Sequence, residues 1–264
     1  MSTSTTTSTS TTCSVYTLPS IGTFTHSAKY TFLTSTLPSG LSISTYPVGN
    51  APYTHLFSTS NIALTPPYLS LTVPGGQSAF PISSAQIATT ATNILHASVR
   101  TTGILSSEPG TCQSSFFYRS DSQEIDIEFL SNRSAASNAL NSLPNQGGAS
   151  SWTNQQKKRL PLHYTNQAVN RSVPETTAFG PSPVGWDDEE HEYRVDWVAG
   201  AVSFWVDGVQ QDEFSSNVPT EAGSWLWSNW ANGDPGWTTG PPVRNSVFKI
   251  RAIEMYYNTT DSGC

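Results

Sequence analysis

The chain has 264 residues, and only 12% of them are charged. Its 12 basic and 19 acidic side chains give a formal net charge of −7 at pH 7. Nucleic acids and anionic membranes bind clustered Lys and Arg, so this balance argues against both as partners. The length is enough for one large domain with a sizeable core, and no segment approaches the ~18 apolar residues of a membrane-spanning helix.

Residues 1–12 are almost entirely Ser and Thr. Such low-complexity sequence cannot bury a core, so we interpret it as a linker or an O-glycosylated stub that precedes a single domain over residues 13–264. The first residues lack the apolar region of a signal peptide, and we therefore expect that Met1 begins a chain without its signal peptide.

Three cysteines, Cys13, Cys112 and Cys264, form an odd set. In a secreted protein an odd count predicts one disulfide and one remaining thiol, or a partner lost by truncation, and the sequence does not decide which two residues pair. The abundance of Ser, Thr, Gly, Pro and Asn favours a secreted protein, located outside the cell or in the cell wall. Three N-glycosylation sequons agree with secretion; they begin at Asn132, Asn170 and Asn258.

Short β-leaning runs alternate with Pro, Gly and Asn turns from residue 13 to about residue 100, as in 29–32, 69–73 and 94–99. Strand-like runs at intervals of roughly 8–12 residues, without helical periodicity between them, are typical of a β-sandwich or barrel. We therefore expect an all-β fold in which helix is confined to short turns.

Three carboxylates alternate with two isoleucines in the stretch 124–128, which reads Glu-Ile-Asp-Ile-Glu. Side chains of a β-strand point to opposite faces with a period of two, so Glu124, Asp126 and Glu128 share one face and the two isoleucines share the other. Three acids on one face repel each other and resist partial burial, which indicates that the arrangement has a function. The alternative is a strand whose polar face is merely solvated.

Glycoside hydrolysis is one chemistry that uses such a face, because it needs a carboxylic acid and a carboxylate on either side of the scissile bond. In a retaining enzyme the two carboxyls lie about 5–5.5 Å apart. The Cα atoms of Glu124 and Glu128 are expected about 13 Å apart at ~3.3 Å per residue, and side chains that lean together close most of this gap. Asp126 between them raises the pKa of at least one neighbour by like-charge repulsion, which suits a proton donor near neutral pH.

The acidic stretch follows the run 114–118 (Ser-Ser-Phe-Phe-Tyr) and a polar turn, and here the chain resembles glycoside hydrolase family 16. It matches the form without a β-bulge, seen in bacterial licheninases and xyloglucan-active relatives, whereas the laminarinase branch usually carries one extra residue before the last Glu. Two later segments match in the same order, H-E-Y-x-x-D-W at 191–197 and W-x-N-G at 230–233. The resemblance covers roughly residues 60–258.

This resemblance implies a concanavalin A-like jelly roll of two antiparallel sheets and a glycosidase that requires no cofactor. Glu124 is then the nucleophile that forms the glycosyl-enzyme. Glu128 is the acid that protonates the leaving oxygen and then the base that activates water. Asp126 hydrogen-bonds the nucleophile, and the apparent pKa values belong to the set of three.

The resemblance also predicts that an earlier strand contributes residues to the cleft. In the family this strand lines the cleft with a Glu and an Arg, and the matching stretch here is 96–100. Arg100 stands at the Arg position, whereas Ser98 stands where licheninases carry the Glu. We therefore expect residues 95–130 to form the spine of the catalytic sheet with Arg100 in the cleft; the alternative for Arg100 is a surface ion pair.

Aromatic residues suggest further sugar contacts. His163 and Tyr164 point to opposite faces of a strand, so one of them faces the cleft. Four tryptophans within 225–237 exceed the needs of a core, and aromatic rings stack on the flat faces of sugars. By alternation Trp225 and Trp227 share one face with Asn229, while Trp230 faces the other unless the strand kinks. The predicted substrate-binding residues are Arg100, Phe117, Arg119, His163, Asn229, Trp230 and Trp237.

Other segments are assigned to structure. The matched hairpin over 191–208 is expected to be a back-sheet element, with Asp196 and Asp207 in structural roles. Four acids at 187–190 allow a structural calcium ion, but their spacing matches no known loop and a solvated turn is the simpler interpretation, so we predict no metal site. The long polar stretch 131–159 is expected to wall one side of the groove.

These predictions together indicate a secreted, endo-acting, retaining β-glucanase that acts as a monomer on β-1,3-1,4-glucan, β-1,3-glucan or both. The bulge-free strand favours the mixed-linkage substrate, while Ser98 and the polar stretch allow β-1,3-glucan or another β-glycan. A transglycosylase would use the same nucleophile and protect the intermediate from water. A lectin-like binding module on the same fold is the non-enzymatic alternative.

Overall fold

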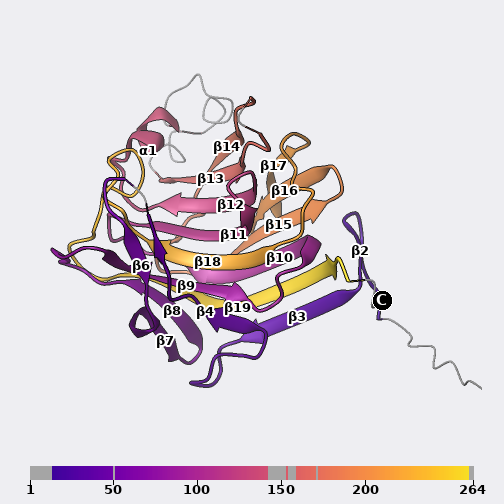
Figure 1. Cartoon of the computed structure of the whole chain (residues 1–264), viewed down its shortest axis with the longest axis horizontal. Coiled ribbons are helices and arrows are strands. Elements are labelled where there is room, and N and C mark those ends of the chain that lie inside the picture. The colour runs from indigo at the N-terminus through magenta and orange to yellow at the C-terminus, as the bar shows by residue number, and fades with distance from the viewer. Residues whose placement is uncertain (1–13, 50, 142–152, 154–158, 171, 262–264) are drawn as a thin grey trace, which may run out of the picture.

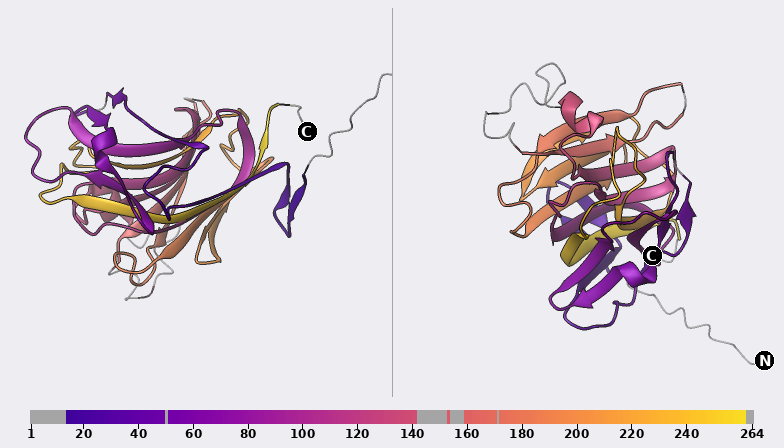
Figure 2. Two further views of the ribbon diagram at one scale, coloured as in Figure 1. Left: turned by 90° about the horizontal axis from the view of Figure 1, so that it is seen from below. Right: turned by 90° about the vertical axis from the view of Figure 1, so that its left-hand side faces the viewer.

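The computed structural model describes residues 14–49, 51–141, 153, 159–170 and 172–261. In these residues two large β-sheets pack face to face as stacked layers (Figure 2). A separate small sheet pairs β1 (Tyr16–Leu18) with β2 (Gly22–Phe24) (Figure 1). The predictions for residues 1–12 and for 142–152 and 154–158 of the polar stretch lie outside the described part of the chain.

The first large sheet carries the acidic stretch and is called the acidic sheet. Its strands follow the order β14-β13-β12-β11-β18-β9-β6-β5, and β4 also pairs with β9. All of these pairings are antiparallel except that of β6 with β9. Its strands are β4 (Leu41–Ile43), β5 (Pro47–Val48), β6 (His55–Phe57), β9 (Ile82–Thr89), β11 (Cys112–Ser120), β12 (Gln123–Leu130), β13 (Pro161–Asn166), β14 (Thr176–Pro181) and β18 (Ser224–Trp230).

The second large sheet is called the opposite sheet. Its order is β17-β16-β15-β10-β19-β8-β7, and β3 also pairs with β19. Its strands are β3 (His26–Thr31), β7 (Ile62–Thr65), β8 (Tyr68–Val73), β10 (Ile94–Ile104), β15 (His191–Val198), β16 (Ala201–Val206), β17 (Val209–Phe214) and β19 (Ser246–Thr259). The predicted sandwich of two antiparallel sheets is confirmed. Helix in the described residues is confined to α1 (Ala136–Asn141) and the 3-10 turn η1 (Thr59–Asn61).

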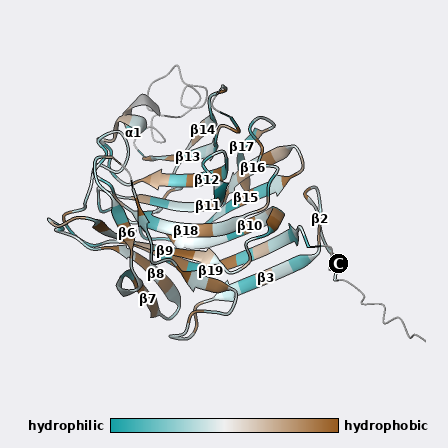
Figure 3. Cartoon of the chain, viewed as in Figure 1, coloured by the Kyte–Doolittle hydropathy of each residue, from teal (hydrophilic) through white to brown (hydrophobic). Residues whose placement is uncertain are grey.

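Strict alternation along the strands explains why two layers form. In β12 the side chains of Ile125, Ile127 and Phe129 are buried between the sheets, while the three acids point away from that core. Figure 3 shows the same mixture of hydrophilic and hydrophobic residues along the strands of both sheets. A strand with one apolar face is stable only when that face is buried against another element, which here is the second sheet.

The largest core side chains are tryptophans that come from both sheets. Trp225 and Trp227 on β18 and Trp197 on β15 are fully buried. The indole N–H of Trp227 donates to Thr101 Oγ1 at 2.7 Å, and that of Trp225 donates to Ser115 Oγ at 3.0 Å. Since each of these two donors is satisfied, the rings add apolar burial without an unpaired polar atom, and truncation to Ala should cost about 3–5 kcal/mol each.

The hairpin of β15 and β16 belongs to the opposite sheet, as predicted. Asp196 accepts a hydrogen bond from Ser98 Oγ at 2.7 Å and pairs with Arg194 at 3.1 Å. Asp207 lies in the turn after β16 and contacts His191 Nδ1 at 2.8 Å. Both acids therefore stabilise the opposite sheet and lie on the other side of the core from the acidic strand.

One prediction about the sheets is wrong. The sequence suggests that residues 95–130 form the spine of one catalytic sheet, but β10 lies between β15 and β19 in the opposite sheet. After Ile104 the chain crosses over to the acidic sheet and begins β11 at Cys112. Neighbouring strands in the sequence therefore belong to different layers, and Ser98 is a buried donor to Asp196 instead of a cleft residue.

The acids at 187–190 are exposed. Glu190 accepts a hydrogen bond from the Tyr68 hydroxyl at 2.7 Å and lies 3.6 Å from Arg251. Across the described residues no group of three or more His, Cys, Asp and Glu side chains is arranged to hold a metal ion. In the same part of the chain no helix is long and apolar enough to cross a membrane.

Cys112 is a free and fully buried thiol, whereas Cys13 and Cys264 lie outside the described residues. The single disulfide that the sequence predicts would therefore join Cys13 to Cys264. Titration with a thiol reagent, without reductant, should detect no reactive thiol in the folded protein and one thiol per chain in denaturant, because burial both shields Cys112 and raises its pKa. Three thiols in denaturant would show that no disulfide exists.

Candidate active site

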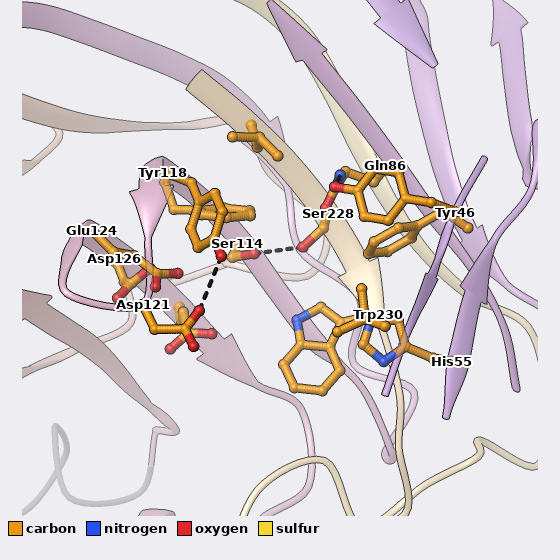
Figure 4. A pocket seen from close by; sticks show the side chains of 15 residues that line it. Tyr46, His55, Gln86, Ser114, Tyr118, Asp121, Glu124, Asp126, Ser228 and Trp230 are labelled. Atoms are coloured by element: carbon orange, nitrogen blue, oxygen red, sulfur yellow. Dashed lines mark hydrogen bonds between the residues drawn. The ribbon is translucent and has the colours of Figure 1, made fainter. Parts of the chain in front are cut away.

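The three acids of β12 lie in one groove on the outer face of the acidic sheet. The groove encloses about 280 Å³. Side chains from β11, β12 and β18 line it, together with residues from the edge of the sheet around β5, β6 and β9. Figure 4 shows Glu124 and Asp126 at one side and Tyr46, His55, Gln86 and Trp230 at the other. The alternation expected from the sequence therefore places all three carboxyls in a single cavity.

Asp126 is the most buried of the three acids, at 3% exposure. The Gln167 side-chain amide donates to its Oδ2 at 3.1 Å. Burial raises the pKa of Asp126 well above its usual range, and the nearby charges of Glu124 and Glu128 raise it further. Asp126 therefore favours its protonated form, and it donates this proton in a hydrogen bond to Glu124.

The surroundings of Glu124 shift its pKa in opposite directions. Burial, and next the charge of Glu128, raise the pKa of Glu124 to about 8, while the hydrogen bond from Asp126 lowers it. A donor to the ionised form stabilises that form, so the protonated Asp126 makes Glu124 easier to ionise. The charge of Glu128 is part of what raises the pKa of Glu124, so Glu124 ionises more easily while Glu128 and Asp126 keep their protons.

Glu128 has different partners. Burial raises the pKa of Glu128 to about 7, opposed by hydrogen bonds from the Cys112 thiol and the Trp237 side chain. The Cys112 sulfur lies 3.1 Å from Glu128 Oε1. A carboxyl with a pKa near 7 exchanges protons readily in neutral solution, as a general acid and base requires.

No basic side chain neutralises this group: among the ion pairs of the described residues, none includes Glu124, Asp126 or Glu128. Three partly buried acids without a counter-ion destabilise the folded state at neutral pH, because both burial and mutual repulsion oppose ionisation. Such groups cluster at functional sites, so this groove is the strongest candidate for an active site in the described chain.

The other side of the groove is built from aromatic rings and amides. Trp230 stacks on His55, with ring centroids 4.9 Å apart and an interplanar angle of 23°. Burial lowers the pKa of His55 to about 4, so the ring is neutral at neutral pH. The Gln86 amide lies beside Tyr46 (Figure 4) and donates to its hydroxyl at 2.6 Å; it also donates to Ser44 Oγ at 2.7 Å. These contacts connect the side chains of the wall to one another and to Ser44.

Three of the predicted substrate-binding residues lie near the acids. Trp230 lines the groove, and Trp237 donates to Glu128. His163 pairs with Glu128 across β12 and β13, so both point to the same face of the sheet. Its Nε2 lies 2.9 Å from Asn138 Oδ1, and burial lowers the pKa of His163 to about 3. Contact of these three side chains with a substrate remains a prediction.

The other four predicted substrate-binding residues lie outside the groove. Phe117 and Asn229 are fully buried in the core, because Ser114, Phe116 and Tyr118 take the groove-facing positions of β11 and Leu226, Ser228 and Trp230 take those of β18. The Asn229 amide donates to the carbonyls of Leu71 and Ser246 and links the two sheets.

The two arginines are displaced for different reasons. Arg100 belongs to β10 of the opposite sheet, where its guanidinium lies 5.8 Å from the centre of the Tyr256 ring. Arg119 lies near the end of β11, is exposed and pairs with Glu221 at 3.6 Å. The predictions that placed Arg100, Phe117 and Asn229 in the groove are therefore wrong. Arg119 lines a neighbouring hollow together with Tyr118 and Asp121, which also line the groove, and its contact with a substrate stays a prediction.

The structure also brings in residues that the sequence did not identify. His55, Gln86 and Tyr46 come from segments far from the acidic stretch, and no motif marks them. Cys112 is the exception, because it lies two positions before Ser114 on β11 and therefore on the same face of the strand, which faces the groove. This two-residue spacing could have identified Cys112 as a groove residue if β11 had been assigned as the neighbour of β12.

No protein-family model and no curated protein matches the chain by sequence. Solved structures do match it. A β-1,3-1,4-glucanase (lichenase) from a mouse hindgut metagenome matches with a TM-score of 0.61 at 17% identity, covering 88% of this chain and 99% of that one. The endo-β-1,3-glucanase from Pyrococcus furiosus matches with a TM-score of 0.66 at 12% identity, covering 93% and 98%.

A third structure, a LamA variant from Z. galactanivorans in complex with laminaritriose and laminaritetraose, has a TM-score of 0.62 at 14% identity and covers 88% of this chain and 99% of that one. At such low identities the likeness concerns the fold. The chain therefore has the same two-sheet fold as these glucanases over most of its length.

Proposed function

We propose that this chain is a retaining endo-β-glucanase of glycoside hydrolase family 16 that hydrolyses β-1,3-1,4-glucan, β-1,3-glucan or both. The observation that carries the proposal is the groove strand itself: Glu124, Asp126 and Glu128 share one cavity, have raised pKa values and have different hydrogen-bond partners. The bulge-free motif supports the family, and the glucanase fold of the similar structures agrees with it.

The proposed reaction assigns one task to each acid. Glu128 donates its proton to the glycosidic oxygen while ionised Glu124 attacks the anomeric carbon, so the leaving sugar departs and a glycosyl-enzyme forms. Glu128, now ionised, takes a proton from water, and the hydroxide oxygen displaces Glu124 from the anomeric carbon. Asp126 keeps its own proton and stabilises ionised Glu124 through the hydrogen bond between them.

The wall formed by Trp230, His55, Gln86 and Tyr46 supports a sugar substrate. The indole of Trp230 can stack on the flat C–H face of a pyranose, and the His55 ring stacks on the indole and supports it. Amide and hydroxyl groups beside it provide partners for sugar hydroxyls. Secretion belongs to the same proposal, on the basis of the composition and the sequons, and we propose that the chain acts as a monomer.

The proposal is tested by incubating the purified chain with lichenan, laminarin and xyloglucan, identifying the products by mass and following the anomeric proton by NMR. We expect oligosaccharides of several lengths from lichenan, laminarin or both, and the β-anomer as the first product. An α-anomer as first product would contradict the retaining mechanism.

Two further outcomes separate the alternatives. A labelled oligosaccharide acceptor that becomes incorporated in preference to hydrolysis would identify a transglycosylase. Binding of a glucan without any cleavage would favour the lectin-like module, since a binding groove needs the aromatic wall but not three acids.

A further inference from the structure

The buried thiol beside Glu128 has no role in the reaction described above. Cys112 is the first residue of β11, is inaccessible to solvent, and points to the same side of the acidic sheet as the three acids. Its sulfur lies 3.1 Å from Glu128 Oε1, which is a hydrogen-bond distance for a thiol donor. Because burial, and next the neighbouring charge of Glu128, raise the pKa of Cys112 well above its usual range, the residue keeps its proton and can donate it to Glu128, although the Trp237 side chain opposes the shift.

The packing around this contact leaves the thiol little freedom. Cys112 packs with Leu130 and Ala135, and Trp237 lies against this cluster. The Trp237 loop is fixed by backbone hydrogen bonds from Ala136 and Ser137 to Pro235 and Gly236. The carboxyl of Glu128 thus has the thiol from β11 at hydrogen-bond distance, and the Trp237 side chain, from the loop after β18, also lowers its pKa.

We propose that Cys112 is a positioning residue for Glu128: its S–H group orients the carboxyl and stabilises the ionised form that exists after the proton has been given to the leaving group. This inference rests on the proposed function, in which Glu128 is the acid and base. A thiol is a weak donor, so it supports the anion without preventing reprotonation for the next cycle. A stronger donor at this position would lower the pKa of Glu128 further.

The other groups that face Glu128 are accounted for. On β12, Glu124 and Glu128 repel each other when both are ionised, whereas Asp126 keeps its proton; His163 on β13 is neutral because burial lowers the pKa of His163 to about 3. On the loop after β18, Trp237 donates, and Asp234 is turned back to accept from the Gly236 N–H at 2.7 Å. Helix α1 contributes no acidic side chain in its first turn and no basic one in its last. Cys112 and Trp237 are therefore the groups that favour the ionised carboxyl.

The test compares Cys112→Ala and Cys112→Val, which remove the donor while decreasing and increasing side-chain volume, with Cys112→Ser, which keeps a donor. Glutamate labelled at the side-chain carboxyl carbon allows the pKa of Glu128 to be read by NMR, with Glu128→Gln as the assignment control. We expect both donor-free variants to raise this pKa by about half a unit, roughly a threefold change in the dissociation constant. The Ser variant should leave it unchanged or lower it.

Kinetics provide the second measurement. In the Ala and Val variants the alkaline limb of kcat/KM should move to higher pH by the same amount. The value of kcat should fall for a glucan, whose leaving group needs the acid, more than for a nitrophenyl glycoside, whose leaving group does not, and KM should change little. A purely structural role for Cys112 would lower stability without producing this difference between leaving groups.

The Raman S–H stretching band tests the contact in case the core variants do not fold. In a Cys13→Ser/Cys264→Ser background this band reports Cys112, and Glu128→Ala should shift it toward the frequency of a free thiol because the acceptor is removed. An unchanged band, or an unchanged Glu128 pKa in both donor-free variants, would overturn the proposal. If the wild-type chain cleaves no glucan, the proposed function fails, but the NMR and Raman measurements still decide whether Cys112 tunes Glu128.

Discussion

Replacing Glu124 with Ala is expected to reduce glucan hydrolysis by about 10⁴-fold or more, the scale of loss that follows removal of a catalytic nucleophile. The substitution removes the group that would form the bond to the anomeric carbon, and it leaves a space open to the α face of the sugar. A small anion such as azide can occupy that space and attack directly. We therefore expect added azide to restore turnover of an activated β-glycoside and to yield the α-glycosyl azide.

The matched control for this experiment is Glu124→Gln, which also removes the nucleophile but fills the space. It should be equally inactive and should not respond to azide. Both variants should fold, because removing a partly buried acid whose pKa is raised relieves repulsion among the three carboxyls. Recovery of turnover as the β-glycosyl azide in Glu124→Ala would assign the nucleophile to a different residue.

Replacing Glu128 with Ala is the second large effect, and it should depend on the leaving group. Without an acid, departure of a sugar hydroxyl becomes very slow, and we expect a loss of about 10²–10⁴-fold on glucan, the usual contribution of general acid catalysis. A nitrophenyl glycoside needs no proton to leave, so the glycosyl-enzyme should still form. Azide then attacks from the β face, and the β-glycosyl azide should accumulate.

The pH dependence of the same variant provides the check. Glu128 has a pKa raised to about 7, so the wild-type rate should fall as pH increases through this value, because the acid loses its proton. In Glu128→Ala the first step with a nitrophenyl substrate should lose this alkaline limb. If the limb persisted there, another group would be the proton donor.

Much of the active strand could be predicted from the sequence because alternation is a local property of the backbone. The stretch 124–128 determines by itself that the three acids share a face opposite Ile125 and Ile127, and the structure has this arrangement. The same rule places Trp225 and Trp227 with Asn229 on the core face and Trp230 on the groove face. It also separates His163 from Tyr164, which is buried in the core.

The sequence could not determine which strands become neighbours. The family resemblance of residues 96–100 predicts Arg100 in the groove, yet β10 pairs with β15 and β19 in the opposite sheet. The wall of the groove arises in the same way: β6 pairs with β9, β9 pairs with β18, and His55 thereby reaches Trp230, which lies 175 positions later in the chain.

The contact of Cys112 with Glu128 likewise exists only because β11 and β12 pair in a register that sets Ser114 opposite Glu128. The sequence by itself determined the side of each strand on which a residue lies, since that depends on a two-residue period. Only the tertiary structure decided which of those sides face one another. Strand pairing is selected by burial of the whole core between two sheets, and the free energy of that burial is shared among residues that are distant in the chain.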